Sequence, residues 1–192
     1  MSKRFPVPVF LAVARGGVAL AAALLAGTVS AQPGTAAPER SAKAAFMYRF
    51  LGYTEFPADA FGNPAAPIVI GVVGSQAMAL ELARLAAGRS VHQRPVMVRQ
   101  FRDNEDPGAA HLLFVAGADR ARAARVLRQA PAGAMLLVTE CGECLQAGSV
   151  INFRMVARQL RFDVSLAAAS RHHLVLSSRL LTLANYVSKG AS

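Results

Sequence analysis

Acidic residues are scarce in this chain, and the motifs of common enzyme classes are missing. Only 11 Asp and Glu residues stand against 21 Lys and Arg residues, which leaves few carboxylates for a catalytic pair. The serine-hydrolase elbow Gly-x-Ser-x-Gly does not occur. The turn containing Gly71 and Gly74 lacks the third glycine of a dinucleotide-binding turn. We therefore expect a protein that is not an enzyme and holds no cofactor.

Cysteine occurs only twice, as Cys141 and Cys144 in the sequence Cys-Gly-Glu-Cys. In an oxidising compartment two cysteines usually form one disulfide. Closing so short a loop stabilises a protein by only ~2 kcal/mol, so the bond would hold a loop rather than the fold. Free thiols are one alternative. A catalytic redox pair is another, although a turn, not a long helix, follows these cysteines.

A zinc site built on the same cysteines is a further alternative. Zinc prefers four Cys or His ligands in a tetrahedron, and in zinc fingers these ligands stand at recognisable spacings. The histidines available for such a site are His92, His111, His172 and His173. None of them lies at a finger-like spacing from the cysteines, so we expect no metal site.

Apolar runs of membrane-spanning length are also missing. The N-terminal run over residues 18–25 covers about 8 residues, well short of the ~20 that a spanning helix needs. It follows the basic residues Lys3 and Arg4 and precedes small residues that end at Ala31. This order is typical of a secretory signal over residues 1–31, with cleavage between Ala31 and Gln32. An uncleaved anchor is the alternative, and export to the periplasm is expected.

The net charge of +10 is carried almost entirely by arginine. Lys43 and Lys189 are the only lysines beyond the predicted signal. A basic exported protein could favour anionic membranes, cell-wall polymers or acidic partners. Because the arginines are dispersed and the periplasm holds no nucleic acid, we expect a solvated basic surface that does not bind nucleic acid.

Hydrophobic periodicity predicts one α/β domain over residues 41–189, after a flexible leader over residues 32–40. Strands that alternate with helices predict a mixed, partly parallel sheet covered by helices, followed by a C-terminal antiparallel hairpin and a terminal helix. The predicted helices cover residues 41–56, 76–87, 119–129 and 166–170 and a last segment from Ser177 or Ser178 to Val187, with Ser41 as the first N-cap. The predicted strands cover residues 68–73, 96–101, 111–115, 135–138, 150–156 and 160–164, with Ile151, Phe153, Met155, Leu160, Phe162 and Val164 facing inward.

Over residues 41–187 the chain resembles the periplasmic YfiR-like proteins. The segments that carry the resemblance are residues 44–50, 53–57, 72–74, 88–91, 94–96, 111–115, 148–153, 160–164 and 177–181. The resemblance implies a non-enzymatic regulator that binds the periplasmic domain of an inner-membrane diguanylate cyclase and represses it. An outer-membrane lipoprotein can sequester such a repressor, and the output is cyclic-di-GMP signalling and biofilm formation. A homodimer is compatible with this role.

The chain departs from the YfiR-like pattern at one pair of positions. Many members carry cysteines near Gly71 and His111, on neighbouring strands, and here both cysteines are absent. We expect that disulfide to be missing as a unit. Any redox control that the resemblance implies would then rest on Cys141 and Cys144 alone.

The expected binding residues lie on the first helix and after the hairpin. Phe46, Arg49 and Phe50 belong to a short aromatic and basic stretch that cannot all face the core at helical spacing. We expect Arg49, Arg171 and His173 to form a basic pocket for a small anionic ligand or an acidic side chain. Ordinary surface roles are the alternative for these residues. For the whole protein, a periplasmic small-ligand-binding sensor and a thiol-disulfide oxidoreductase are the competing hypotheses.

Overall fold

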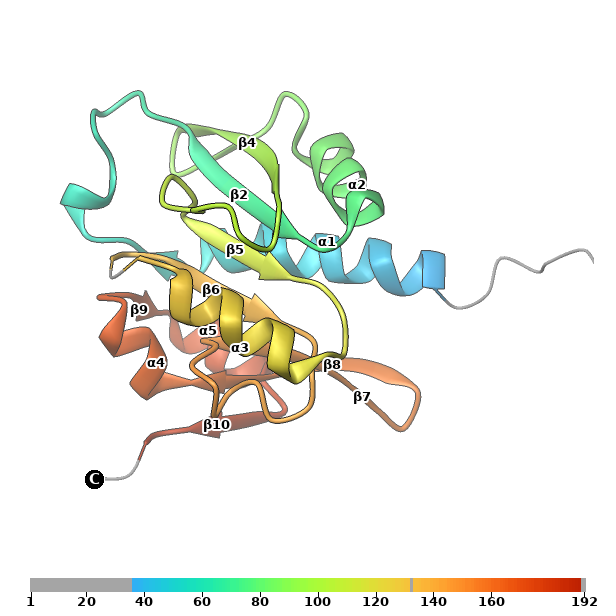
Figure 1. The fold of residues 1–192 in the computed structure, drawn as a ribbon. Coiled ribbons are helices and arrows are strands. Elements are labelled where there is room, and N and C mark those ends of the chain that lie inside the picture. The colour runs from blue at the N-terminus through green and yellow to red at the C-terminus, as the bar shows by residue number, and fades with distance from the viewer. Residues whose placement is uncertain (1–35, 132, 191–192) are drawn as a thin grey trace, which may run out of the picture. The chain divides into compact units, whose positions relative to one another are not determined.

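The computed structural model describes residues 36–131 and 133–190. These residues form a curled mixed sheet of eight strands, five α-helices and a separate two-stranded sheet (Figure 1). This architecture confirms the predicted α/β class. The predicted signal, its cleavage site at Ala31 and Gln32, and residues 32–35 of the predicted leader lie outside the described residues.

The predicted strands and helices appear in the predicted order, and further short elements that were not predicted lie between and after them. They are α1 (Ala36–Gly52), β1 (Thr54–Glu55), the 3₁₀ helix η1 (Ala58–Ala60), β2 (Ile68–Val73), α2 (Gln76–Ala86), β3 (Ser90–Val91), β4 (Arg94–Phe101), β5 (Leu112–Val115), α3 (Arg120–Gln129), β6 (Leu136–Thr139), β7 (Ile151–Val156), β8 (Gln159–Ser165), α4 (Leu166–Arg171), β9 (Val175–Leu176), α5 (Ser178–Leu183) and β10 (Tyr186–Ser188).

The large sheet has the strand order β10-β8-β7-β6-β5-β2-β4-β3. Its middle strands, from β7 to β4, pair in parallel, while β7 with β8 and β3 with β4 pair antiparallel. The chain moves from β2 to β4 in one direction and from β5 to β6 in the other. Because such crossovers are right-handed, α2 and α3 lie on opposite faces of the sheet, as Figure 1 shows. Helix α1 packs beside α2.

The predicted hairpin is present, and its facing pattern holds except at the tip. Phe153 lies opposite Phe162, and both are buried. The prediction for Met155 is wrong, because its side chain is 51 % exposed. The tip of the hairpin projects beyond the helical layers in Figure 1, so no element covers it. Ala157 and Arg158 form the turn, with φ values of 48° and 63° that match a two-residue type I′ connection.

Helix α1 begins five residues before the predicted N-cap, Ser41. Residues 36–40, predicted as part of a flexible leader, are therefore helical. Pro38 falls in the first turn, where a missing amide hydrogen costs nothing, and Glu39 pairs with Lys43 one turn later. The Ser41 hydroxyl instead donates to Glu81 of α2 at 2.8 Å.

The predicted terminal helix is shorter than expected. Ser177 caps α5 by accepting the Leu180 amide, as predicted, but the helix ends at Leu183. The residues that follow form β10, which pairs in parallel with β8. Asn185 directs this change, because its amide donates to the Phe162 carbonyl and its side chain to Asp163.

The main core lies between helix α1 and the sheet. Aromatic rings of α1 pack on rings from the strands below it, with Phe50 and Phe162 edge to face and 4.9 Å apart between ring centroids. The rings of this aromatic cluster belong to Phe46, Phe50, Phe114, Phe153 and Phe162. Such contacts add to the free energy of burial because edge-to-face and offset rings attract one another.

Gly71 of β2 lies where a side chain would not fit. A Cβ there would lie 2.9 Å from Leu113 Cδ1 and from Phe101 Cε2, and 3.1 Å from the Cβ of Ala110. The position where many YfiR-like proteins carry cysteine is thus filled by the neighbouring core side chains.

We predict that Gly71→Ala lowers the free energy of unfolding by about 1–3 kcal/mol, because overpacking a filled core forces its neighbours out of place. Gly52→Ala is the matched control, since a Cβ at Gly52 meets nothing within 4 Å. Urea unfolding followed by circular dichroism measures both variants. Equal stability of the two variants would contradict the packing at Gly71.

Candidate functional site

Two short strands bring the end of helix α1 beside the segment that follows α4. β1 and β9 pair antiparallel in the separate small sheet. The Thr54 hydroxyl donates to the Phe50 carbonyl at 2.8 Å, which ties β1 to the last turn of α1. The Ser177 amide donates to the Tyr53 carbonyl at 2.9 Å. Segments far apart in the sequence thus form one fixed unit.

Exposed side chains flank this small sheet and form what we call the β1–β9 surface. Its members are Arg49, Glu55, Arg171, His173 and Val175. Val175 is an apolar side chain with 61 % of its area exposed, and it lies opposite Glu55 in the strand pair. Among residues 36–131 and 133–190, no hydrogen bond or ion pair joins Arg49 to Arg171 or His173. Each of the three predicted residues is exposed, and no contact draws them into one pocket.

The position of His173 follows from the way helix α4 ends. Its φ of 55° is left-handed, and its amide donates to the Ser170 carbonyl. The Leu174 amide then donates to Ala169. A left-handed residue at this point is a common helix terminator, and histidine adopts this conformation more readily than most residues. The helix end therefore sets the place of the exposed His173 ring.

Two of the predicted binding residues belong to the core instead. Phe50 is only 2 % exposed, so its predicted place on a binding surface is wrong. Phe46 is half-buried and packs on Phe50, Phe153 and Phe162. Both rings face the sheet because α1 crosses it, which leaves Arg49 on the outer side of the helix.

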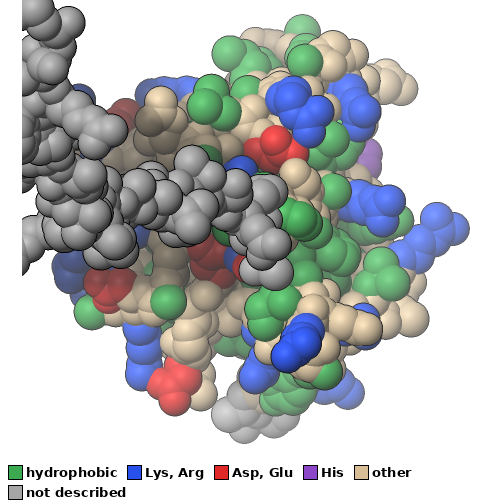
Figure 2. Space-filling view, turned by 90° about the vertical axis from the view of Figure 1, so that its right-hand side faces the viewer, with side chains coloured by type: hydrophobic (Ala, Val, Ile, Leu, Met, Phe, Trp, Pro, Cys, Tyr) green, Lys and Arg blue, Asp and Glu red, His purple; other side chains and the backbone are tan. Residues whose placement is uncertain are grey.

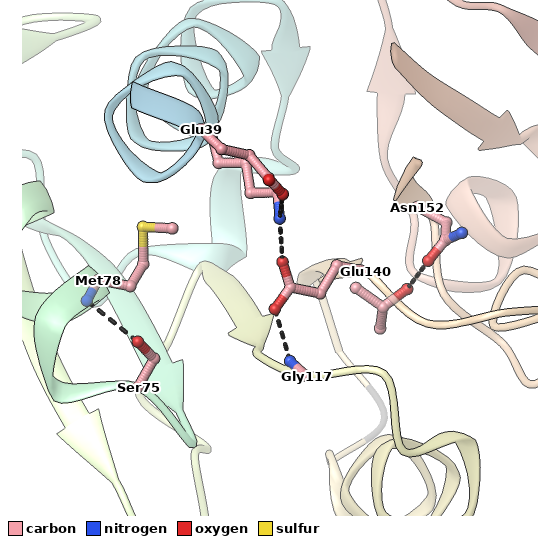
Figure 3. A network of polar contacts seen from close by, with 8 residues as sticks. Glu39, Ser75, Met78, Gly117, Glu140 and Asn152 are labelled. Carbon is pink, nitrogen blue, oxygen red and sulfur yellow. Dashed lines mark hydrogen bonds and ion pairs between the residues drawn. The ribbon is translucent and has the colours of Figure 1, made fainter. Parts of the chain in front are cut away.

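A polar network anchors α1 to the carboxyl ends of the parallel strands (Figure 3). The Lys43 ammonium lies 2.5 Å from Glu140 and 2.5 Å from Glu39, and Glu140 also accepts the Gly117 amide at 2.6 Å. Burial lowers the pKa of Lys43, but the hydrogen bonds and charges of Glu140 and Glu39 outweigh this effect and raise it overall. Lys43 is therefore held charged at the point where α1 meets β5 and β6.

Arg122 fills the crevice between the ends of β2 and β5, where open α/β sheets often bind ligands. Its guanidinium donates to both carboxylate oxygens of Asp103 at 2.5 and 2.7 Å and to the Ala116 carbonyl at 2.7 Å. A Cβ at Gly74 would lie within 2.2 Å of this guanidinium. The hydrogen bond from Arg122 lowers the pKa of Asp103. The chain thus occupies with its own side chains the place that a nucleotide phosphate takes in such folds.

The two cysteines form a disulfide with Cα atoms 5.5 Å apart. Both are buried, and the loop that holds them continues as turns rather than as a helix. Reactive thiols need exposure and usually a helix N-terminus that stabilises the thiolate. Cys141 and Cys144 have neither, so the bond holds the loop between β6 and β7 in place.

A pocket of about 670 Å³ opens between this disulfide loop and strands β7, β8 and β10. Its floor carries buried polar groups. Asn152 Oδ1 accepts from the Thr139 hydroxyl at 2.7 Å. Asp163 accepts from Arg154 at 2.9 Å and from Asn185 at 2.8 Å. Since Glu140 precedes Cys141 and also lines the pocket, one wall of the pocket connects directly to the network that holds α1.

His111, one of the candidate zinc ligands, joins strand β2 to the 3₁₀ helix η1. Its Nδ1 accepts the Val69 amide at 3.1 Å, and its Nε2 lies 3.1 Å from the Ala60 carbonyl. The ring stacks on Phe61 at 4.6 Å between centroids, and Arg94 covers the other face of Phe61. Burial and the charge of Arg94 lower the pKa of His111, although the bond to Ala60 acts against them. The ring is therefore a neutral structural link.

Metal and membrane sites can be assessed over residues 36–131 and 133–190. Within these ranges no three His, Cys, Asp or Glu side chains meet in a group that could hold a metal ion. In the same ranges no helix has the length and apolar character needed to cross a membrane. Basic side chains are scattered over the face in Figure 2 rather than gathered in one stripe, whereas a nucleic-acid-binding face concentrates them.

Comparison with protein families gives a match over most of the chain. A family model described as YfiR/HmsC-like matches residues 40–185 of the chain. The matched region includes the β1–β9 surface, the disulfide loop and most of the polar network. No curated protein matches the chain.

We predict that Lys43→Met lowers the free energy of unfolding by roughly 1–3 kcal/mol, because it leaves two carboxylates without their partner in a partly buried place. The Lys43 and Glu140 side chains are only 12 % and 18 % exposed. Arg84→Met is the control, since Arg84 pairs with Glu81 while 73 % exposed. Thermal unfolding should show a clear loss for the first variant and little change for the second; equal losses would contradict the role of the network.

His111 predicts a pH dependence of stability. Its pKa is lowered in the folded state, so protons bind the unfolded chain better between the ordinary value of 6.5 and the folded value. The contribution of neutral His111 to the free energy of unfolding is therefore full above this pH window, and it is lost as the pH falls through the window. His111→Asn retains an acceptor for the Val69 amide but does not titrate. Urea unfolding between pH 7.5 and 5 should show a flatter slope for this variant than for His173→Asn; identical slopes would contradict the assignment.

Proposed function

Because the chain belongs to the YfiR/HmsC-like family, we propose that it is a periplasmic regulator that represses an inner-membrane diguanylate cyclase. It binds the periplasmic part of the cyclase and holds the enzyme inactive. Release of the cyclase raises cyclic-di-GMP and promotes biofilm formation. An outer-membrane lipoprotein that sequesters the regulator provides the release. The family is generally regulatory and non-catalytic.

The observation that carries this proposal is the combination of the family match with the β1–β9 surface. Val175 projects an apolar side chain into solvent from a strand that is paired with β1. Apolar side chains held on a rigid base and bordered by polar groups are typical of protein contacts. The exposed Arg49, Arg171 and His173, on the elements that lead into β1 and β9, favour a partner surface with acidic side chains.

The surface is presented in a fixed form before any partner arrives. β1 follows α1 directly, and α1 is held by the aromatic cluster and by the contact of Lys43 with Glu140. A preformed surface loses little conformational entropy on binding. Such a protein represses the cyclase by staying bound to it, so repression needs no chemical step.

A deletion and complementation experiment tests this function. Deleting the gene should raise cellular cyclic-di-GMP, and the wild-type gene should restore the low level. Val175→Asp and Arg171→Glu should each fail to restore it, because they reverse the polarity of the β1–β9 surface without touching the core.

The control for this experiment is Leu80→Asp on α2. Leu80 is 64 % exposed, so it matches Val175 in apolar character and exposure but lies outside the β1–β9 surface. This variant should restore the low level of cyclic-di-GMP. Unchanged cyclic-di-GMP in the deletion strain would reject the proposed function, and equal failure of Leu80→Asp would reject the assigned surface.

The pocket beside the disulfide loop favours a second candidate function, a periplasmic sensor of a small polar ligand. Its volume of about 670 Å³ and its floor of Asn152, Asp163 and Ser165 suit a compound with several hydrogen-bonding groups. A ligand that binds only the folded state raises the melting temperature. Thermal-shift screening against amino acids and nucleotides should then yield a hit that Asn152→Leu abolishes; no hit would reject this function.

A further inference from the structure

Strand β4 is an open edge of the large sheet along most of its length. Its outer neighbour within residues 36–131 and 133–190, β3, pairs with two of its residues, Arg94 and Pro95. Its inner neighbour β2 pairs with all residues from Val96 to Phe101. Edge strands offer a row of unpaired amide and carbonyl groups, and a further strand can pair with them.

One hydrogen bond shows which main-chain groups of β4 point outward, away from β2. The Val96 amide donates outward to the Arg89 carbonyl. Main-chain groups in a parallel ladder alternate between the two neighbours, so Val98 and Gln100 also point outward. Within the described residues neither of them has a hydrogen-bond partner on that side. Two consecutive outward positions are therefore free to pair with an incoming strand.

A groove runs along this edge. A hollow of about 560 Å³ lies between the C-terminal half of α2 and β4. Its apolar lining comes from Ala83, Ala87, Val96, Met97 and Val98. Met97 is 52 % exposed although it is large and apolar. The groove gives a side chain of an added strand a place to pack, which a bare edge would not offer.

The edge is strongly basic. From Arg89 to Arg102 the chain carries four arginines and no Asp or Glu. Arg94 is already engaged, since it donates to the carbonyls of Asn63 and Ala66. Arg99 lies 3.6 Å from Glu105, a long and exposed contact of little strength. Most of the positive charge along the edge is thus available to a partner.

This charge decides between two occupants. In an antiparallel pair of two copies centred on Val98, Arg94 of one copy would lie opposite Arg102 of the other. Glu105 of each copy contacts only its own Arg99 and Arg102 amide, and strand β4 itself carries no acidic residue, so like charges would meet across the pair and destabilise it. A second copy is therefore a poor occupant, whereas a strand with Asp or Glu side chains complements the edge.

We propose that the outer edge of β4 binds an extended acidic segment of a protein partner by strand addition. Main-chain bonds to Val98 and Gln100 hold the segment, an apolar side chain enters the groove beside Met97, and acidic side chains face the arginines. The proposal goes beyond the proposed function, which uses the β1–β9 surface. The two surfaces are built on different sheets, since β4 belongs to the large sheet and β9 to the small one.

The test starts from random twelve-residue peptides displayed on phage and selected on the exported protein. Recovered peptides should be rich in Asp and Glu and poor in Pro. Bound to the protein, a selected peptide should slow hydrogen exchange of the Val98 and Gln100 amides at least tenfold. N-methylation of alternate peptide amides should weaken binding at least tenfold, because it removes the main-chain bonds without altering the protein.

Protein variants test the contribution of the arginine charges separately from that of the main-chain bonds. The double variant Arg99→Gln with Arg102→Gln should weaken binding at least tenfold. Arg125→Gln with Arg128→Gln on α3, also exposed arginines, should leave it unchanged. Selected peptides that are not acidic, that leave Val98 and Gln100 exchange unchanged, or that tolerate N-methylation would overturn the proposal. Slow exchange at these amides that depends on protein concentration without peptide would assign the edge to a second copy and would also overturn it.

Discussion

The contact between the Lys43 ammonium and the Glu140 carboxylate, 2.5 Å apart, seats helix α1 on the carboxyl ends of the parallel strands. It restricts how far α1 can slide, and the aromatic cluster beneath the helix restricts how it can roll. β1 continues from α1 and pairs with β9, so the β1–β9 surface takes its position from this contact. Because Glu140 directly precedes Cys141, the disulfide loop is held by the same residue.

The regular part of the fold could be predicted because its pattern is local. Alternation in the β7–β8 hairpin and apolar runs in the parallel strands indicate how each segment is buried. Other features depend on distant partners. The early start of α1 involves Lys43 and its partner Glu140, 97 residues away, and β10 forms only because β8 offers an edge to Asn185 and the residues after it. Met155 follows the alternating pattern but lies past the point where helices cover the sheet.

The candidate site likewise combines residues that local sequence predicts with residues whose role depends on distant partners. Arg49, Arg171 and His173 could be selected from the sequence because charged residues near element ends are usually exposed, and the structure places them so. Helical spacing cannot say which side of a helix faces the sheet, so Phe50 was assigned to the surface although it is core. Lys43 stands out in the sequence because it is one of only two lysines beyond the predicted signal peptide. Its partner Glu140 could not be identified without the fold. The open edge of β4 is likewise a property of strand order alone.

Under the proposed function, a rigid base with an exposed binding surface lets the protein act on the cyclase by binding alone. Amide hydrogen exchange of the protein, alone and bound to the periplasmic domain of the proposed cyclase partner, tests this most directly. We expect the amides of residues 44–51 in α1 to exchange slowly in both states, and those of residues 53–55 and 173–177 to slow only in the complex. Fast exchange along α1 in the free protein, or protection on binding that spares the β1–β9 surface, would contradict it.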